Sequence, residues 1–196
     1  MVLLLNVAMV AALVVVGLAS HSLGVLAAGG DYVGDATGVA LSLVALRISR
    51  HVHGHPRATS YAALVNAAFL LLVTVVVIVE ALRRLITGTP HVEALPVIVV
   101  SVIAGVVMAF CALLIGTVES DDLNMRSVML DTLADGISAG GVAISGAIIL
   151  AAQGAFWLDP AVALGIALII AYHAIRLIRD VRAALRAGPD SNTGVV

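Results

Sequence analysis

The chain has 196 residues, of which 62% are hydrophobic and only 11% are charged. A typical soluble domain carries about 25% charged residues, so this composition excludes an ordinary soluble domain and predicts an integral membrane protein. The formal net charge of −2 argues against nucleic acid as a partner.

Six apolar segments are long enough to cross a bilayer as helices, which takes roughly 20 apolar residues each. No Lys or Arg precedes the first segment, so we interpret it as a spanning helix rather than a signal peptide. The predicted fold class is an all-α membrane protein, a six-transmembrane-helix bundle over residues 1–186, followed by a short disordered cytoplasmic tail at 187–196. The predicted spans are residues 2–19, 23–47, 59–86, 94–118, 124–152 and 160–182.

The arginines predict the orientation of this bundle. All ten basic residues are Arg, and in a six-span arrangement only Arg83 and Arg84 fall on the side opposite to the other eight. Because basic residues accumulate in cytoplasmic segments, we expect both termini to be cytoplasmic. The expected location is a bacterial inner (plasma) membrane, crossed several times.

Two pairs of aspartates lie inside predicted spans. The second span contains Asp31 and Asp35, and the fifth contains Asp131 and Asp135. Residues four apart share one face of a helix. A charge at the bilayer centre costs at least about 2.5–3.5 kcal/mol, so four such groups require compensation from each other, from polar neighbours or from a cation.

The depths of the two pairs match. At about 1.5 Å per residue, Asp31 lies about 18 Å and Asp35 about 12 Å from the inner edge of the bilayer. On the antiparallel fifth span, Asp135 lies about 16 Å and Asp131 about 10 Å from that edge. The sequence therefore predicts a cage of four carboxylates near the midplane. The alternative is four separately satisfied acids, each bonded to Ser, Thr or Tyr neighbours.

Small residues flank both pairs and predict close contact between the second and fifth spans. Such residues allow membrane helices to approach closely, although stripes of small residues are also common in any helical bundle. The residues concerned are Gly30, Gly34 and Gly38 on the second span, and Gly136, Ala139, Gly140 and Gly141 on the fifth.

Four crowded carboxylates would titrate as a coupled set that is partly protonated when empty. A divalent cation requires deprotonated ligands, so its binding would release protons. The chemistry therefore indicates exchange of a metal ion for protons. An all-oxygen ligand set favours harder ions such as Mn²⁺, while Zn²⁺ and Fe²⁺ remain open because carboxylates also bind zinc.

Four segments resemble the cation diffusion facilitator family of divalent-metal/proton antiporters. "SLGVLAAGGDYVGDATGVALSLVAL" resembles the family's second helix, "GHPRATSYAALVNA" and "EALRRLITGTP" the two ends of its third, and "NMRSVMLDTLADGISAGGVAISG" its fifth. The resemblance implies a secondary active transporter that exports Mn²⁺, Zn²⁺, Fe²⁺ or Co²⁺ from the cytoplasm, with no resident cofactor and no enzymatic activity. It places the transport site at Asp31, Asp35, Asp131 and Asp135.

The chain departs from the family's pattern in two respects. The expected cytoplasmic domain does not fit in the remaining length, and the usual His-rich loop between spans four and five is replaced by "ESDDLN". The resemblance therefore leaves homodimer formation open. In some bacterial members the loop between spans two and three holds a second metal site, and His51 and His55 match its histidines. A solvated basic loop is the slightly favoured alternative, because no acid stands nearby to complete the site. The expected partners are thus divalent metal ions, protons and the lipid bilayer.

Two other functions are compatible with parts of the sequence. A membrane prenyltransferase also uses two Asp-rich motifs, which hold Mg²⁺ and a diphosphate. Such enzymes need more than six spans and basic residues close to the motifs, whereas Arg126 is more than one turn from the nearest aspartate here. The other alternative is a transport-inactive regulatory subunit, against which the complete set of four aspartates argues.

Overall fold

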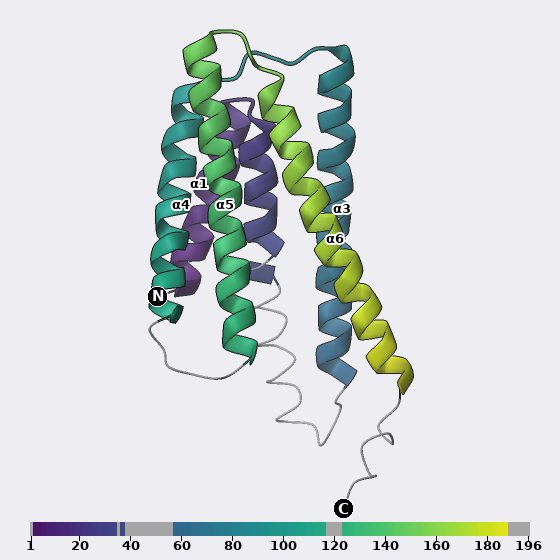
Figure 1. The fold of residues 1–196 in the computed structure, drawn as a ribbon. Coiled ribbons are helices and arrows are strands. Elements are labelled where there is room, and N and C mark those ends of the chain that lie inside the picture. The colour runs from purple at the N-terminus through teal and green to yellow at the C-terminus, as the bar shows by residue number, and fades with distance from the viewer. Residues whose placement is uncertain (1, 35, 38–56, 117–122, 188–196) are drawn as a thin grey trace, which may run out of the picture.

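The computed structural model describes residues 2–34, 36–37, 57–116 and 123–187. These residues form an all-helical bundle without strands, as predicted (Figure 1). A further helical stretch, residues 23–34, follows α1 in the chain. The labelled helices are α1 (Val2–Ala19), α3 (Arg57–Thr87), α4 (Ala94–Gly116), α5 (Leu123–Ala152) and α6 (Leu158–Ala187).

Four of the helices have the length and composition to cross a bilayer, and the shorter stretch Val7–Ala19 of α1 is also apolar. The protein is therefore a multi-pass membrane protein. The four spanning segments are Ala63–Thr87, Ala94–Leu113, Thr132–Ala152 and Leu158–Ala183.

The helices pack as antiparallel neighbours. The main pairs are α4 with α5 and α3 with α6, and α5 also contacts α6. In Figure 1, α3 and α6 stand together on one side, while α1, α4 and α5 form the other side and the 23–34 helix lies between them. The beginning of α1 and the end of α6 lie at the same end of the bundle, here named the terminal end. The opposite end, with the α3–α4 and α5–α6 connections, is named the connection end.

The start of α6 differs from the prediction by two residues. The helix begins at Leu158 rather than at Pro160. Proline is tolerated in the first turn of a helix because the N–H that it lacks has no partner there in any case. Asp159, also in this first turn, was assigned to a loop by the sequence, but its side chain is fully buried.

Asp159 links α6 to the beginning of the 23–34 helix. Its carboxylate accepts hydrogen bonds from the Ser22 hydroxyl at 2.5 Å, from the Leu23 N–H at 2.6 Å and from the Gly24 N–H at 3.2 Å. The first N–H groups of a helix have no partner within the helix. Asp159 satisfies two of them from outside, and its negative charge is favourable at the positive end of the helix dipole.

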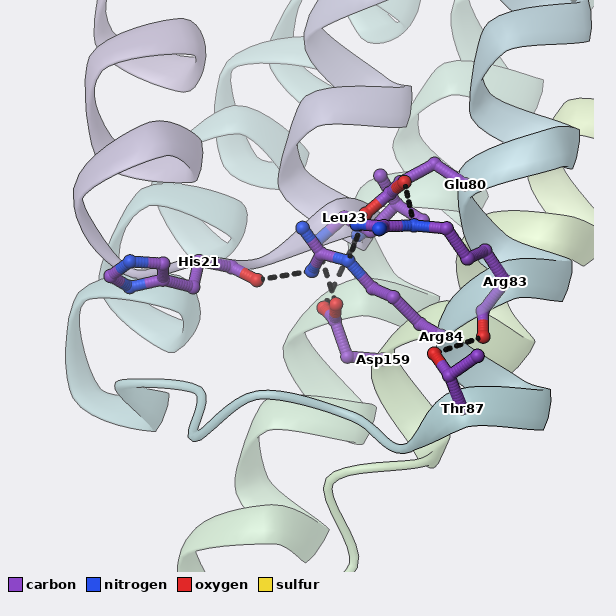
Figure 2. Close-up of polar contacts among 8 residues, drawn as sticks. His21, Leu23, Glu80, Arg83, Arg84, Thr87 and Asp159 are labelled. Carbon is purple, nitrogen blue, oxygen red and sulfur yellow. Dashed lines mark hydrogen bonds and ion pairs between the residues drawn. The ribbon is translucent and has the colours of Figure 1, made fainter.

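A second polar cluster secures the same end of the bundle (Figure 2). Glu80 accepts hydrogen bonds from Arg83 and from Arg84, with nitrogen–oxygen distances of 2.9–3.0 Å. Arg84 also donates to the backbone carbonyl of His21 at 2.7 Å. This contact joins α3 to the turn after α1, where His21 has a positive φ of 57°. The connection end is therefore held by charged groups that are already paired.

The glycines of the 23–34 helix contact a different neighbour from the one predicted. A Cβ placed on Gly30 would lie 3.0 Å from Val73, and one on Gly34 would overlap Leu70. Both partners belong to α3, so the expectation that these two glycines meet the fifth span was wrong. The reason is that spacing identifies a face of a helix but not the helix that this face contacts. Gly24 is the glycine that meets α5, where a Cβ would lie 3.4 Å from Val142.

Candidate metal-binding cavity

The contact between Gly24 and Val142 sets the register of the 23–34 helix against α5. Moving seven residues along each antiparallel helix, about two turns or 10 Å, leads from Gly24 to Asp31 and from Val142 to Asp135. Two turns return each chain to nearly the same helix face. Asp31 and Asp135 are therefore level with each other along the bundle.

Both aspartates line one cavity of about 220 Å³. Their side chains are half-buried, in contrast to the fully buried Asp159. Two carboxylates on a shared wall, within the membrane part of the chain, can provide oxygen ligands to a cation. The cavity is lined by Asp31 of the 23–34 helix, by Asn66 and Leu70 of α3, by Ala134, Asp135 and Ser138 of α5, and by Ile166, Ile169, Ile170, His173, Ala174 and Leu177 of α6.

The structure does not describe the side chains of the other predicted ligands. Asp131 belongs to α5, but its side chain is not among those described. Asp35, His51 and His55 lie outside the described residues. Among the side chains that the structure does describe, no group of three or more His, Cys, Asp or Glu could hold a metal ion. Of the four predicted ligands, the structure thus describes the side chains of Asp31 and Asp135, and the cage of four remains a prediction.

Two lining residues were missed by the sequence analysis. His173 was not among the predicted site residues, yet it lines the cavity from α6, with its ring 5.8 Å from that of Tyr172. Asn66 of α3 was not considered at all, and its Oδ1 atom is buried without a hydrogen-bond partner among the described groups. Neither residue has a second polar residue four positions away, which was the pattern that identified the aspartates. The available signal was a polar side chain inside an apolar span, which the sequence shows for Asn66 in "YAALVNAAFLL".

The apolar part of the lining comes mainly from α6. Isoleucines and leucines of α3 and α6 face the wall that carries the aspartates. Such a wall lowers the local dielectric constant, which strengthens the attraction between a carboxylate and a cation. The cavity therefore has an anionic wall and an apolar wall, with Asn66 and His173 as the polar groups on the apolar side.

Comparison with known proteins identifies the family. Residues 1–185 match the family model described as the cation efflux transmembrane domain. The zinc transporter ZitB of Pectobacterium atrosepticum is 32% identical over 191 residues, which are 93% of this chain and 58% of that protein. ZitB of Yersinia pseudotuberculosis is 30% identical over 172 residues, covering 84% of this chain and 54% of that protein.

A third relative bears a broader name. The cadmium, cobalt and zinc/H(+)-K(+) antiporter of Bacillus subtilis is 26% identical over 187 residues, 91% of this chain and 60% of that protein. The chain thus spans less than two thirds of the length of each of these relatives. The family match over residues 1–185 confirms the resemblance found in the sequence: the chain belongs to the cation efflux, or cation diffusion facilitator, family of membrane proteins.

Proposed function

We propose that this chain exports divalent transition-metal cations from the cytoplasm in exchange for protons, with the cation bound by Asp31 and Asp135 together with Asp35 and Asp131. The observation that carries the proposal is the position of Asp31 and Asp135 on one cavity, level with each other on two antiparallel helices. Carboxylates that share one cavity can exchange protons for a cation, because the cation requires them ionised.

The relatives' names support a metal cation as the substrate. Two are zinc transporters by name, and a third is an antiporter for cadmium, cobalt and zinc. The ligand chemistry adds manganese and iron, since the proposed site is made of oxygen atoms only. We therefore propose Zn²⁺, Mn²⁺, Fe²⁺ and Co²⁺ as the substrates to be compared.

The prenyltransferase alternative gains no support from the cavity. Binding a diphosphate requires basic groups, and none of the residues that the structure places on the cavity wall is an arginine. Family membership also favours a transporter over an enzyme.

The test is metal-driven proton movement in everted membrane vesicles that contain the full chain. A pH-sensitive dye reports proton release when ZnCl₂, MnCl₂, FeCl₂ or CoCl₂ is added to energised vesicles. We expect at least one of these salts to produce a signal with the wild type and none to do so with Asp135→Ala. The matched control is Asp180→Ala, which removes a carboxylate that is 70% exposed near the terminal end. A wild-type response no larger than that of vesicles without the protein, for all four metals, would contradict the proposal.

A further inference from the structure

Asn66 lies on the same cavity as the aspartates but at a different level. Its neighbour one turn along α3, Leu70, lies beside Gly34 of the antiparallel 23–34 helix. Asn66 is four residues from Leu70 towards the terminal end, and Asp31 is three residues from Gly34 towards the connection end. The two levels are therefore separated by about seven residues, or roughly 10 Å along the bundle.

Side chains tilt towards the N-terminus of their own helix, so those of Asn66 and Asp31 diverge on the two antiparallel helices. With metal–oxygen bonds of roughly 2.0–2.6 Å, we infer that the two residues bind an ion at separate positions. Both residues nevertheless line one continuous cavity. Asn66 therefore marks a second position in that cavity, nearer to the terminal end than the level formed by Asp31 and Asp135.

The chemical state of Asn66 indicates what this position does. Its Oδ1 atom is buried and has no hydrogen-bond donor within the described part of the chain. A buried acceptor without a partner costs about 1–3 kcal/mol, and α3 is otherwise apolar at this depth, with Leu64, Val65, Phe69 and Leu70 nearby in sequence. An amide oxygen is also a good ligand for divalent cations.

We propose that the side-chain oxygen of Asn66 is a transit ligand, which binds the divalent cation between the terminal end of the bundle and the aspartates. The inference rests on the proposed function and adds a residue on α3 to a site otherwise formed by the 23–34 helix and α5. A neutral oxygen suits a transit position, because it replaces a water ligand of the ion without adding a charge that would hold the ion there. His173, on the facing helix α6 and exposed, lies on the same wall of the cavity.

Uptake kinetics in everted vesicles test the proposal with three proteins, namely wild type, Asn66→Leu and Asn66→Asp, each measured over a range of MnCl₂ and ZnCl₂ concentrations. Leucine has a similar volume and no oxygen, so we expect the KM to rise about tenfold while the maximal rate changes less. Aspartate keeps an oxygen at this position but adds the charge that would hold the ion there, so we expect Asn66→Asp to show a KM no higher than that of the wild type and a lower maximal rate.

Thermal unfolding of the same purified proteins separates a ligand from a structural residue. Removing an unpartnered buried oxygen should leave the melting temperature of Asn66→Leu unchanged or raised. Unchanged kinetics in Asn66→Leu would overturn the inference while leaving the proposed function intact. A parallel fall in rate and melting temperature in both variants would also overturn it, since Asn66 would then be structural. Absence of transport by the wild type would overturn both proposals.

Discussion

Two kinds of carboxylate lie in the membrane part of this chain, and their surroundings distinguish them. Asp159 is fully buried, and its two oxygens accept three hydrogen bonds at 2.5–3.2 Å. Its acceptor positions are occupied by the protein itself, so its role is structural. Asp31 and Asp135 are half-buried and line a cavity large enough for an ion and water. The first arrangement joins helices, and the second places two carboxylates on the wall of a cavity.

The structural role of Asp159 can be measured as stability. Asp159→Ala leaves the N–H groups of Leu23 and Gly24 buried without this acceptor, and each such loss costs about 1–3 kcal/mol. We expect a lower melting temperature in detergent, with a smaller loss for Asp159→Asn, which keeps one side-chain oxygen. Asp180→Ala on the same helix is the control. The Asp180 carboxylate lies 3.9 Å from Arg176 and both side chains are 70% exposed, so we expect its loss to change the melting temperature little. Equal melting temperatures for Asp159→Ala and wild type would contradict this role.

The proposed transport role of Asp135 can be measured as metal preference. Asp135→His replaces an oxygen ligand by an imidazole nitrogen, which zinc accepts readily and manganese favours less. We expect the ratio of Zn²⁺ to Mn²⁺ uptake to rise several-fold in a competition assay with both ions present. Leu133→His, an exposed position two residues away on α5, is the matched control for an added histidine. An identical ratio in Asp135→His and wild type would count against direct coordination.

At the scale of the helices, the glycines determine how closely the 23–34 helix approaches α3. A Cβ on Gly34 would overlap Cδ2 of Leu70 and lie 2.7 Å from its Cγ. Leu70 also lines the cavity. The absence of a side chain at Gly34 therefore sets both the helix contact and the width of the cavity beside the aspartates.

This contact predicts the effect of a single methyl group. Gly34→Ala forces Leu70 to move, and overpacking of this kind costs about 1–3 kcal/mol. Because Leu70 can move towards the cavity, we expect a loss of transport as well as a lower melting temperature. Gly140→Ala is the control, since a Cβ on Gly140 of α5 would meet no described atom within 4 Å. Transport and stability that are the same in both variants would show that the close approach at Gly34 is unimportant.

The positions of the helices could be predicted from the sequence, but their contacts with one another could not. Hydropathy located every described helix to within a few residues, because the bilayer imposes a length on each span. That Asp31 and Asp135 lie level along the bundle could be predicted by counting residues along two antiparallel helices. The partners of Gly30 and Gly34, the burial of Asp159 and the position of Asn66 depend on which helices are neighbours. No local pattern in one span contains that information.

At the scale of the whole molecule, the exposed arginines that the structure describes and that do not bind Glu80 lie at the terminal end. Arg83 and Arg84 at the connection end both bind Glu80. The last part of α6 carries four arginines, all with exposed side chains, and the only described acidic group near them is Asp180, 3.9 Å from one of them. Glu80 partly neutralises the two arginines at the connection end. The difference in positive charge between the two ends is therefore larger than the numbers of arginines alone indicate. These four are Arg176, Arg179, Arg182 and Arg186.

Positive charge of this kind faces the cytoplasm, so we predict that the terminal end is cytoplasmic and that the cavity receives its cation from that side, past Asn66. Cys111 is the chain's one cysteine, so Cys111→Ser gives a background without thiols. In that background, Glu93→Cys places a thiol at an exposed position of the connection end, and Ala183→Cys places one near the end of α6 while keeping all four arginines. A maleimide that does not cross membranes should label Glu93→Cys in intact cells and Ala183→Cys only after permeabilisation. The opposite labelling pattern would reverse the orientation, and the exchange proposed here would then carry metal into the cell rather than out of it.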